Sequence, residues 1–538
     1  MTPRARRALF SVVLFFVVCA VAGSVLQRKV GAQSSADESQ LRDSLKTFTD
    51  VYALVEQNYA EPITGDKADT AIYDGAIPGM LRVLDPHSNF YDPKAYAKMR
   101  EDQHGRYYGV GMTIQQQNGK VFVVFPFEGT PSFRAGIRPA DVISAIDGKS
   151  TDGLSSDLVA KQLKGPKGTH VQVTMVREGQ PKPLVFDLVR DEIPNPSVDL
   201  KYEIRPGIGY IHLKQFQETT AQEVNEGIDS FGDLHGLILD LRGNPGGLLS
   251  QAVEVCDHLL AKGQGIVSQR GRAYPDQNYS ATHGNNGKTF PIVVLVNRNT
   301  ASAAEIVSGA LQDHDRALIV GETTFGKGLV QTVYNLNENT GLALTTYHYY
   351  TPSGRLIQRN YAGVSLYDYY YNHAGAQPAN NSNREVKLTD AGRTVYGGGG
   401  ITPDEKIETP KSNHFQDTLI GKGVFFHYAA HYLANRTVER NFQADDAVLA
   451  DFKQYLTSQS IPWTNEDLNA PGVLDWVKVS IKDKILTSQF GQLQGLRTMA
   501  DWDPMIQKAL TYLPEAQALE DTAHKVLTQK AMARNEAP

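Results

Sequence analysis

Residues 291–331 read PIVVLVNRNTASAAEIVSGALQDHDRALIVGETTFGKGLVQ. The apolar run at 291–297 predicts a short buried strand, and the apolar spacing after residue 302 predicts a helix. The apolar residues just before Gly321 predict another strand. Within this stretch one serine and one lysine, Ser302 and Lys327, are framed by small residues. The order of strand, helix and strand indicates a sheet with helices packed on it.

The same alternation begins upstream of this stretch. From about residue 205, the apolar segments IGYIHL and GLILDLR predict two buried strands, and TTAQEVNEGIDSF and LLSQAVEVCDHLL predict helices. Residues 342–354, LALTTYHYYTPSG, predict a late strand. We therefore expect an α/β core over residues 192–410, within which the polar, Tyr-rich segment 361–400 is expected to be a long surface insertion.

The regions flanking this core differ in character. Apolar residues at helical spacing predict helices over 40–60 and 68–84. Residues 98–191 are rich in glycine and β-branched residues; the pair Asn118-Gly119 before KVFVVF predicts a hairpin, and DGLSSDLVAKQLKG predicts one helix. From 411 to 538 helical periodicity returns, and we expect a helical accessory domain there.

The composition limits the classes of function. The chain has 538 residues, a net charge of −6 and no long basic block, so nucleic acid is not expected as a partner. Its two cysteines, Cys19 and Cys256, predict no disulfide framework. No metal-binding motif stands out, and we expect neither a metal nor a cofactor.

The N-terminus predicts export. Arginines at positions 4, 6 and 7 precede an uncharged, mostly apolar run over residues 8–26. This pattern is typical of a signal peptide or of an uncleaved signal anchor in the inner membrane, and residues 1–30 are assigned to it. The small residues of KVGAQS offer a cleavage site, so both readings stay open. Either reading places the rest of the chain in the periplasm or another extracytoplasmic space.

Ser302 is a candidate nucleophile. It lies where the predicted strand becomes a helix, and such a turn exposes a hydroxyl at the edge of a sheet. The N–H of Ala303 would have no partner within the helix and is a candidate oxyanion donor. The alternative is an ordinary helix N-cap, which serine often provides.

Lys327 is the candidate base for that nucleophile. No histidine stands in a recognisable triad context, since His258 and His314 lie in helical patterns. A lysine can act as a base only when neutral, which requires a desolvated site. The flanking glycines let the backbone come close, and Gln331 could support the amine without adding charge. A phosphate loop is disfavoured because GETTFGKG has glycine where that motif needs Ser or Thr.

The segment LDLRGNPGG, residues 239–247, supplies a third element. It predicts a buried strand that runs into bare backbone amides, and those of Gly246 and Gly247 could complete an oxyanion hole with Ala303. Taken singly, the segment could equally be a tight turn. Together, the three elements favour acyl transfer on a Ser-Lys dyad.

These motifs resemble those of the carboxy-terminal processing proteases, the tail-specific serine endopeptidases of bacteria and chloroplasts. NRNTASAAEIVSGALQD resembles their nucleophile segment, GETTFGKGLVQ their lysine segment and DLRGNPGG their oxyanion-side loop; LDPHSNFYDP and GGITPD resemble flanking motifs. Thr300 and Ala304 stand where the family usually has serine, and Glu305 matches a family glutamate that either braces the site or is an ordinary first-turn residue. The resemblance implies Ser302 as nucleophile, Lys327 as base and Gln331 as its support.

The resemblance also implies a fold class and partners. It implies an α/β protease core with a ClpP/crotonase-like sheet, an inserted PDZ domain over 98–191, a helical N-terminal part over 31–97, and the helical C-terminal extension. YYGVGM resembles a PDZ carboxylate-binding loop, and the implied peptide-binding residues are Tyr108, Gly109, Val110 and Gly111. AGIRPADVISAIDGKS resembles the Gly-Asp turn of that family, with Ala140 in place of the usual glycine. The expected partners are protein substrates with free C-terminal tails, with a homo-oligomer left open. A non-catalytic tail-binding adaptor and an apolar-ligand-binding relative are the alternatives, and the intact dyad disfavours both.

Overall fold

The computed structural model describes residues 39–63, 65–372 and 385–536. The chain divides into two compact units, residues 1–83 and 84–538. The first unit contains a helix over 39–58, followed by α2 (Asp66–Thr70), a π-helical turn (Ala71–Ala76) and α3 (Ile77–Arg82). The expected signal peptide or anchor lies outside the described residues. Among the residues that are described, no helix combines the length and apolar character needed to cross a membrane.

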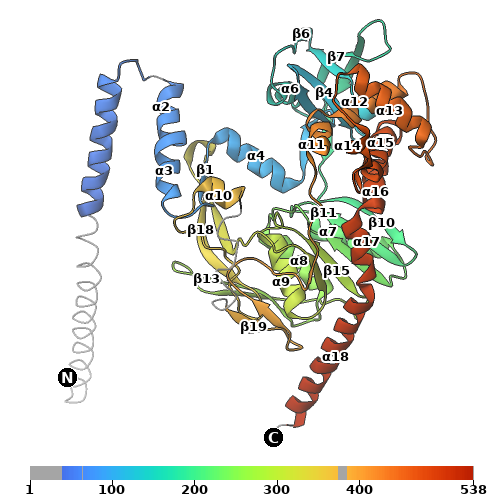
Figure 1. The fold of residues 1–538 in the computed structure, drawn as a ribbon. Coiled ribbons are helices and arrows are strands. Elements are labelled where there is room, and N and C mark those ends of the chain that lie inside the picture. The colour runs from blue at the N-terminus through green and yellow to red at the C-terminus, as the bar shows by residue number, and fades with distance from the viewer. Residues whose placement is uncertain (1–38, 64, 373–384, 537–538) are drawn as a thin grey trace, which may run out of the picture. The chain divides into compact units, whose positions relative to one another are not determined.

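A six-stranded sheet forms the centre of the second unit (Figure 1). Its strand order is β10-β11-β12-β15-β16-β21, in which β10 is antiparallel to β11 and every other pair is parallel. These strands are β10 (Val198–Arg205), β11 (Ile208–Leu213), β12 (Gly236–Asp240), β15 (Ile292–Val296), β16 (Leu318–Gly321) and β21 (Glu405–Lys406). The apolar runs at 208–213, 236–240 and 292–296 therefore form neighbouring strands, as their sequences predict.

Helices cover both faces of this sheet because its strands are apolar on both sides. Along β15, Ile292, Val294 and Val296 pack in one core with α7 (Thr220–Ser230), α8 (Leu249–Leu259) and α9 (Ala303–Asp313). Val293 and Leu295 point to the opposite core, which contains residues of α16 (Gln492–Trp502), α17 (Pro504–Thr511) and α18 (Leu513–Glu536). Fully buried parallel strands read as continuous apolar runs for this reason.

The C-terminal helices consequently belong to two different cores. Helices α11 (His414–Gly421), α12 (Val424–Leu433), α13 (Asp446–Ser458), α14 (Asn465–Asn469) and α15 (Val473–Phe490) build a core of their own. Helices α16–α18 instead cover one face of the central six-stranded sheet. The expected helical domain over 411–538 is thus divided, because sequence periodicity shows that a helix has an apolar face but not which surface covers that face.

A second, antiparallel sheet lies next to the segment that contains Lys327. Its strands are β1 (Asn89–Tyr91), β13 (Gly265–Gly271), β14 (Gln277–Ser280), β17 (Leu329–Asn335) and β18 (Gly341–Tyr350). β17 and β18 form a hairpin in which Gln331 pairs with Thr345. Lys327 precedes β17 by two residues.

The β-rich segment forms a small sheet with a core of its own. The sheet order is β3-β4-β5-β7-β8, with β3 (Met112–Gln117) at the edge and β4 (Lys120–Pro126) beside it; the other strands are β5 (Val142–Ile146), β7 (His170–Val176) and β8 (Leu184–Val189). The predicted hairpin is present: Gln117 pairs with Lys120, and both turn residues, Asn118 and Gly119, have positive φ. The predicted helix is α6 (Ser156–Leu163).

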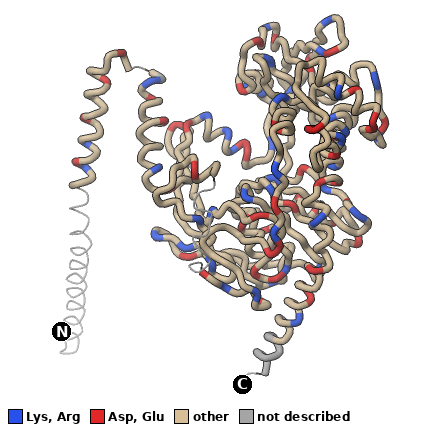
Figure 2. The backbone as a smooth tube through the Cα atoms, in the orientation of Figure 1, with Lys and Arg blue, Asp and Glu red and all other residues tan. Residues whose placement is uncertain are grey.

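The expected surface insertion over 361–400 is only partly at the surface. It contains α10 (Leu366–Tyr370) and a hairpin of β19 (Val386–Leu388) and β20 (Thr394–Tyr396). Tyr369 and Val395 are buried. The prediction was wrong here because aromatic side chains of a polar, glycine-rich segment can still be covered by distant parts of the chain. Charges of both signs are interspersed along the described chain (Figure 2).

Candidate active site

A cavity of about 370 Å³ brings the predicted catalytic residues together. It lies among α8, α9, β17 and β18, and its walls include both halves of the expected dyad. The lining residues that matter for the chemistry are Ser302, Lys327, Gln331, Gly247, Ala303 and His87. Segments far apart in the sequence thus contribute to one site, as the combination of motifs predicts.

Ser302 occupies a strained turn between β15 and α9. Its φ and ψ are 55° and −116°, whereas an ordinary N-cap residue has extended backbone dihedrals. A non-glycine residue at such dihedrals is held there by its surroundings, and such residues gather at active sites. Two hydrogen bonds hold the backbone of Ser302 in this conformation. Its carbonyl accepts the N–H of Glu305 at 2.8 Å and the Tyr349 hydroxyl at 3.1 Å. This geometry favours the nucleophile over the plain cap.

Glu305 connects the serine and lysine segments. Its fully buried carboxylate accepts the N–H of Ser302 at 2.8 Å and the N–H of Lys327 at 2.9 Å on the same oxygen, Oε2. Oε1 accepts the N–H of Gly326 at 2.7 Å and the Thr324 hydroxyl. Burial raises the pKa of Glu305 to about 7, and the hydrogen bonds that it accepts oppose that rise. One carboxylate therefore holds the backbone of both dyad residues.

Lys327 has the electrostatic environment that a lysine base requires. Burial lowers the pKa of its ammonium group below the ordinary value, while the negative charges of Glu305 and Asp85 partly oppose the shift. A lysine with a lowered pKa spends more time neutral near pH 7 and can then accept a proton. The glycines beside it are required by close backbone contacts: a Cβ on Gly328 would lie 2.8 Å from the backbone nitrogen of Gln358.

Gln331 lies on the same cavity wall. Its Nε2 donates to the Thr345 hydroxyl at 3.1 Å. That bond orients the carboxamide, and it leaves Oε1 as the atom that can accept a hydrogen bond from an amine. The arrangement suits the predicted role of a neutral support for Lys327.

Two of the three predicted oxyanion donors are available. Within the described part of the chain, the N–H groups of Gly247 and Ala303 have no hydrogen-bond partner, and both residues line the cavity. Gly246 differs, because its N–H donates to Asn244 Oδ1 at 2.8 Å. The Asn244 Nδ2 in turn donates to the Leu213 carbonyl at 2.7 Å. Gly246 thus shapes the loop, and its amide is not free to hold an oxyanion.

We expect Gly246→Ala to impair catalysis through a direct clash. A Cβ there would lie 2.7 Å from the Ser302 Cβ and 2.9 Å from the Ala303 nitrogen, and the residue has a φ of 98°. Displacing the nucleophile by about 1 Å is expected to lower kcat by about 10²-fold. Gly243→Ala is the matched control, since Gly243 also has a positive φ of 72° but has open space at its Cβ. Steady-state kinetics and thermal melts of both variants separate the clash from the general cost of positive φ; equal kcat values would contradict the expectation.

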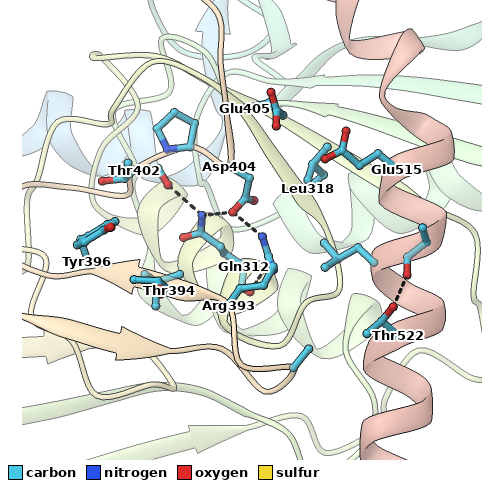
Figure 3. A pocket seen from close by; sticks show the side chains of 15 residues that line it. Gln312, Leu318, Arg393, Thr394, Tyr396, Thr402, Asp404, Glu405, Glu515 and Thr522 are labelled. Atoms are coloured by element: carbon cyan, nitrogen blue, oxygen red, sulfur yellow. Dashed lines mark hydrogen bonds and ion pairs between the residues drawn. The ribbon is translucent and has the colours of Figure 1, made fainter.

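A second, larger cavity of about 600 Å³ lies between the segment 391–405 and α18 (Figure 3). Its polar groups are used for structure. Gln312 Nε2 donates to the Thr402 carbonyl and to Asp404, each at 2.9 Å, and Arg393 forms an ion pair with Asp404. The other oxygen of Asp404 accepts the N–H of Ile319 in β16. These contacts fasten the chain to the edge of the sheet, and the predicted dyad lines the smaller cavity instead.

Comparison with known proteins identifies the family. Residues 207–365 match the model of peptidase family S41, residues 109–187 match a PDZ domain, and residues 415–470 match the C-terminal helical domain of a probable PDZ-protease family. Over 353 residues the chain is 40% identical to the carboxy-terminal-processing protease of Bartonella bacilliformis. The aligned region covers 64% of this chain and 80% of that relative. The chain belongs to the carboxy-terminal processing proteases.

A second relative agrees with this assignment. The carboxy-terminal processing protease CtpB of Bacillus subtilis is 31% identical over 333 residues, covering 61% of this chain and 68% of the relative. Among solved structures, the photosystem II D1 C-terminal processing protease is 27% identical with a TM-score of 0.34, covering 67% of this chain and 92% of that one. As a member of this family the chain is a serine peptidase, and the predicted fold class of α/β protease, PDZ domain and helical C-terminal region is confirmed.

The loop predicted to bind peptides leads into the edge strand of the PDZ sheet of this carboxy-terminal processing protease. Tyr108 and Gly109 end β2 (Arg106–Gly109), and Val110 and Gly111 connect β2 to the edge strand β3. The Val110 carbonyl accepts the N–H of Ser132, and the Gly111 carbonyl accepts the N–H of Phe127. Among the described residues, none accepts a hydrogen bond from the N–H groups of Val110 and Gly111. The carbonyls of Val110 and Gly111 thus already accept hydrogen bonds, whereas their N–H groups can still donate. A pair of such N–H groups makes a backbone site suited to an anion.

Sequence reasoning missed two features of the protease site. The double role of Glu305 was left open because a first-turn glutamate is common in helices. His87 belongs to the motif LDPHSNFYDP, which indicates no role for it, yet it lines the cavity of Ser302 and Lys327. The available signal was the histidine that stands between the two Asp-Pro pairs of that motif, just before a strand.

Proposed function

We propose that the chain is an exported serine endopeptidase that captures proteins by their free C-terminal tails and cleaves them near those tails. Ser302 is the nucleophile and Lys327 is the general base. The observation that carries this proposal is the single cavity lined by Ser302, Lys327, Gln331, Gly247 and Ala303. Burial of the lysine, which lowers its pKa, supports the role of base.

The chemistry follows from these groups. Neutral Lys327 takes the proton from the Ser302 hydroxyl as the oxygen attacks the scissile carbonyl. The N–H groups of Gly247 and Ala303 stabilise the oxyanion of the tetrahedral intermediate. The lysine then gives its proton to the leaving amine, which leaves an acyl-enzyme. Lys327 next removes a proton from water, which attacks the ester, releases the new C-terminus and restores Ser302.

Two further parts of the proposal rest on other regions. Capture of a tail is supported by the backbone amides of Val110 and Gly111 and by the edge position of β3, which can add a peptide strand. Export is supported by the arginines and the apolar run of residues 1–26. Fractionation of cells that express the full chain tests export: we expect the protein outside the cytoplasm, in the membrane fraction if the leader stays as an anchor and in the soluble fraction if it is cleaved.

A free tail carboxylate should control the rate of cleavage. A protein substrate with an apolar C-terminal tail is compared with the same protein ending in a carboxamide, which has no charge for the PDZ loop to bind. We expect KM to rise by about 10-fold or more for the amide, with little change in kcat, because the loop contacts only the tail. Cleavage is followed by mass spectrometry of both products, with Ser302→Ala as the inactive control. Equal KM values for the two substrates would refute tail capture, and cleavage by Ser302→Ala would refute the proposed nucleophile.

A further inference from the structure

His87 lies on the wall of the catalytic cavity, in a tight loop that Asp85 closes. Asp85 Oδ1 accepts the N–H groups of His87 and Ser88, each at 2.7 Å, and Oδ2 accepts the Ser88 hydroxyl at 2.6 Å. These three hydrogen bonds fix the backbone of His87 relative to β1. The ring therefore has a defined position on the wall of the cavity that Lys327 also lines.

The hydrogen bonds around the imidazole determine its tautomer. The Tyr370 hydroxyl donates to the Pro86 carbonyl at 2.6 Å, so it can only accept from His87 Nδ1, which lies 3.2 Å away. Nδ1 therefore carries the proton. Nε2 is then an acceptor for the Tyr369 hydroxyl at 3.0 Å. The ring is held in the neutral Nδ1–H form with both nitrogens engaged.

Tyr369 carries the contact onward to the lysine segment. The N–H of Gly328 donates to Gln358 Oε1 at 2.8 Å, which orients the carboxamide so that Nε2 faces the Tyr369 hydroxyl at 3.2 Å. The N–H of Arg359 donates to the Gly326 carbonyl at 2.9 Å. The chain from His87 through Tyr369 and Gln358 thus ends on the backbone at Gly328, the residue directly after Lys327.

A second arm leads from the same loop to Gln331. The Ser88 hydroxyl accepts the N–H of Thr345 at 3.1 Å, and the Thr345 hydroxyl accepts from Gln331 Nε2, also at 3.1 Å. The loop at 85–88 therefore contacts, through one intermediate residue, the glutamine expected to support the amine. Hydrogen bonds from the loop that contains His87 thus lead both to the backbone after Lys327 and to the Gln331 side chain.

We propose that His87 is a positioning residue of the proposed Ser-Lys site, acting as a neutral hydrogen-bond acceptor that fixes Tyr369 and, through Gln358, the backbone after Lys327. The inference rests on the proposed function of Lys327 as base. Burial and the positive charge of Lys327 lower the pKa of His87 to about 3, which agrees with a ring that stays neutral while the enzyme works. The imidazole itself is not the base, because both of its nitrogens are occupied by tyrosine hydroxyls.

The test compares variants that remove or keep the acceptor. His87→Leu removes it, His87→Gln places an amide oxygen near the position of Nε2, and Tyr369→Phe removes the partner hydroxyl. We expect kcat to fall about 10- to 100-fold in His87→Leu and in Tyr369→Phe with KM nearly unchanged, and we expect His87→Gln to recover most of the loss. Tyr367→Phe is the matched control, since Tyr367 lies on the same helix and its side chain is exposed.

The pH profile provides a readout that a merely structural role would not change. Lys327 faces His87, Glu305 and Asp85, and a loosened lysine segment would let water reach the amine and raise its pKa. The acid limb of kcat/KM should therefore move to higher pH in His87→Leu and in Tyr369→Phe. The two changes combined should cost no more than either alone, because they interrupt one chain of contacts.

Three results would overturn the proposal. These are an unchanged kcat and acid limb in Tyr369→Phe, fully additive losses in the double variant, or a loss in His87→Gln down to the level of Ser302→Ala. If Tyr369→Phe has the expected effect, the chain of hydrogen bonds from His87 through Tyr369 and Gln358 remains supported even when His87→Leu fails to fold. Activity in Ser302→Ala, measured in parallel, would refute the proposed function and not the placement of His87.

Discussion

Ser302→Ala and Lys327→Ala should each lower kcat by about 10⁶-fold, with the double variant no slower than either. Ser302 supplies the oxygen that forms the acyl-enzyme, and Lys327 is the base that removes its proton in the same step. Because the two groups act as a unit, their losses should not add. The measurement is single-turnover cleavage of a protein substrate, combined with labelling of the hydroxyl by a fluorophosphonate probe.

The pH dependence of the wild type tests the same pair. Burial lowers the pKa of Lys327, so the amine is neutral and active above that pKa and is inactivated as the pH falls through it. Glu305, whose pKa is raised to about 7, titrates nearby, and the acid limb therefore belongs to the coupled pair. A wild type that binds tails but neither cleaves nor takes up the probe would contradict the dyad and favour a tail-binding adaptor.

Glu305→Ala should cause the largest combined loss of stability and activity in the protein. The substitution removes the acceptor of four hydrogen bonds, three of them from backbone N–H groups in the turns of Ser302 and Lys327. Leaving several buried donors without partners should reduce the free energy of unfolding by about 3 kcal/mol or more. Glu305→Gln keeps the shape but directs an NH₂ group at N–H donors, and we expect kcat to fall about 10²- to 10³-fold. Urea unfolding and kinetics on the same samples provide both quantities.

The stability of the wild type should also depend on pH through this residue. The folded-state pKa of Glu305, about 7, lies above the ordinary value of 4.5. The folded protein therefore binds the extra proton between these values, and the stabilisation present below pH 4.5 is lost as the pH rises towards 7. Glu305→Gln should remove this component of the pH dependence.

Glu223→Gln is the matched control for Glu305. Glu223 lies in the first turn of α7, outside the catalytic cavity, and its carboxylate accepts the N–H of Val198 at 2.8 Å. We expect kcat in this variant to stay within about twofold of wild type. Equal losses of kcat in the two glutamine variants would show that the effect of Glu305 is general destabilisation and not the placement of the dyad.

Much of the fold could be predicted because its signals are local. The apolar runs at 208–213, 236–240 and 292–296 form adjacent strands, and the Asn118-Gly119 turn closes a hairpin with positive φ at both residues. Ser302 and Lys327 could be selected because a strand-to-helix turn and a glycine-flanked lysine are sequence patterns with a chemical reason. The prediction that segment 361–400 lies at the surface was wrong for Tyr369, because its burial depends on residues far away in the chain.

The sequence by itself determined the order of elements, the PDZ-containing family and the two residues of the proposed dyad. Only the tertiary structure decided which partners hold them. It placed the Glu305 carboxylate between the serine and lysine segments, gave the Gly246 amide to Asn244, set His87 against Tyr369, and used α16–α18 to cover the back of the sheet. Periodicity and turn chemistry act over a few residues. The choice of a hydrogen-bond partner or a packing surface is made by groups that meet only after the chain has folded.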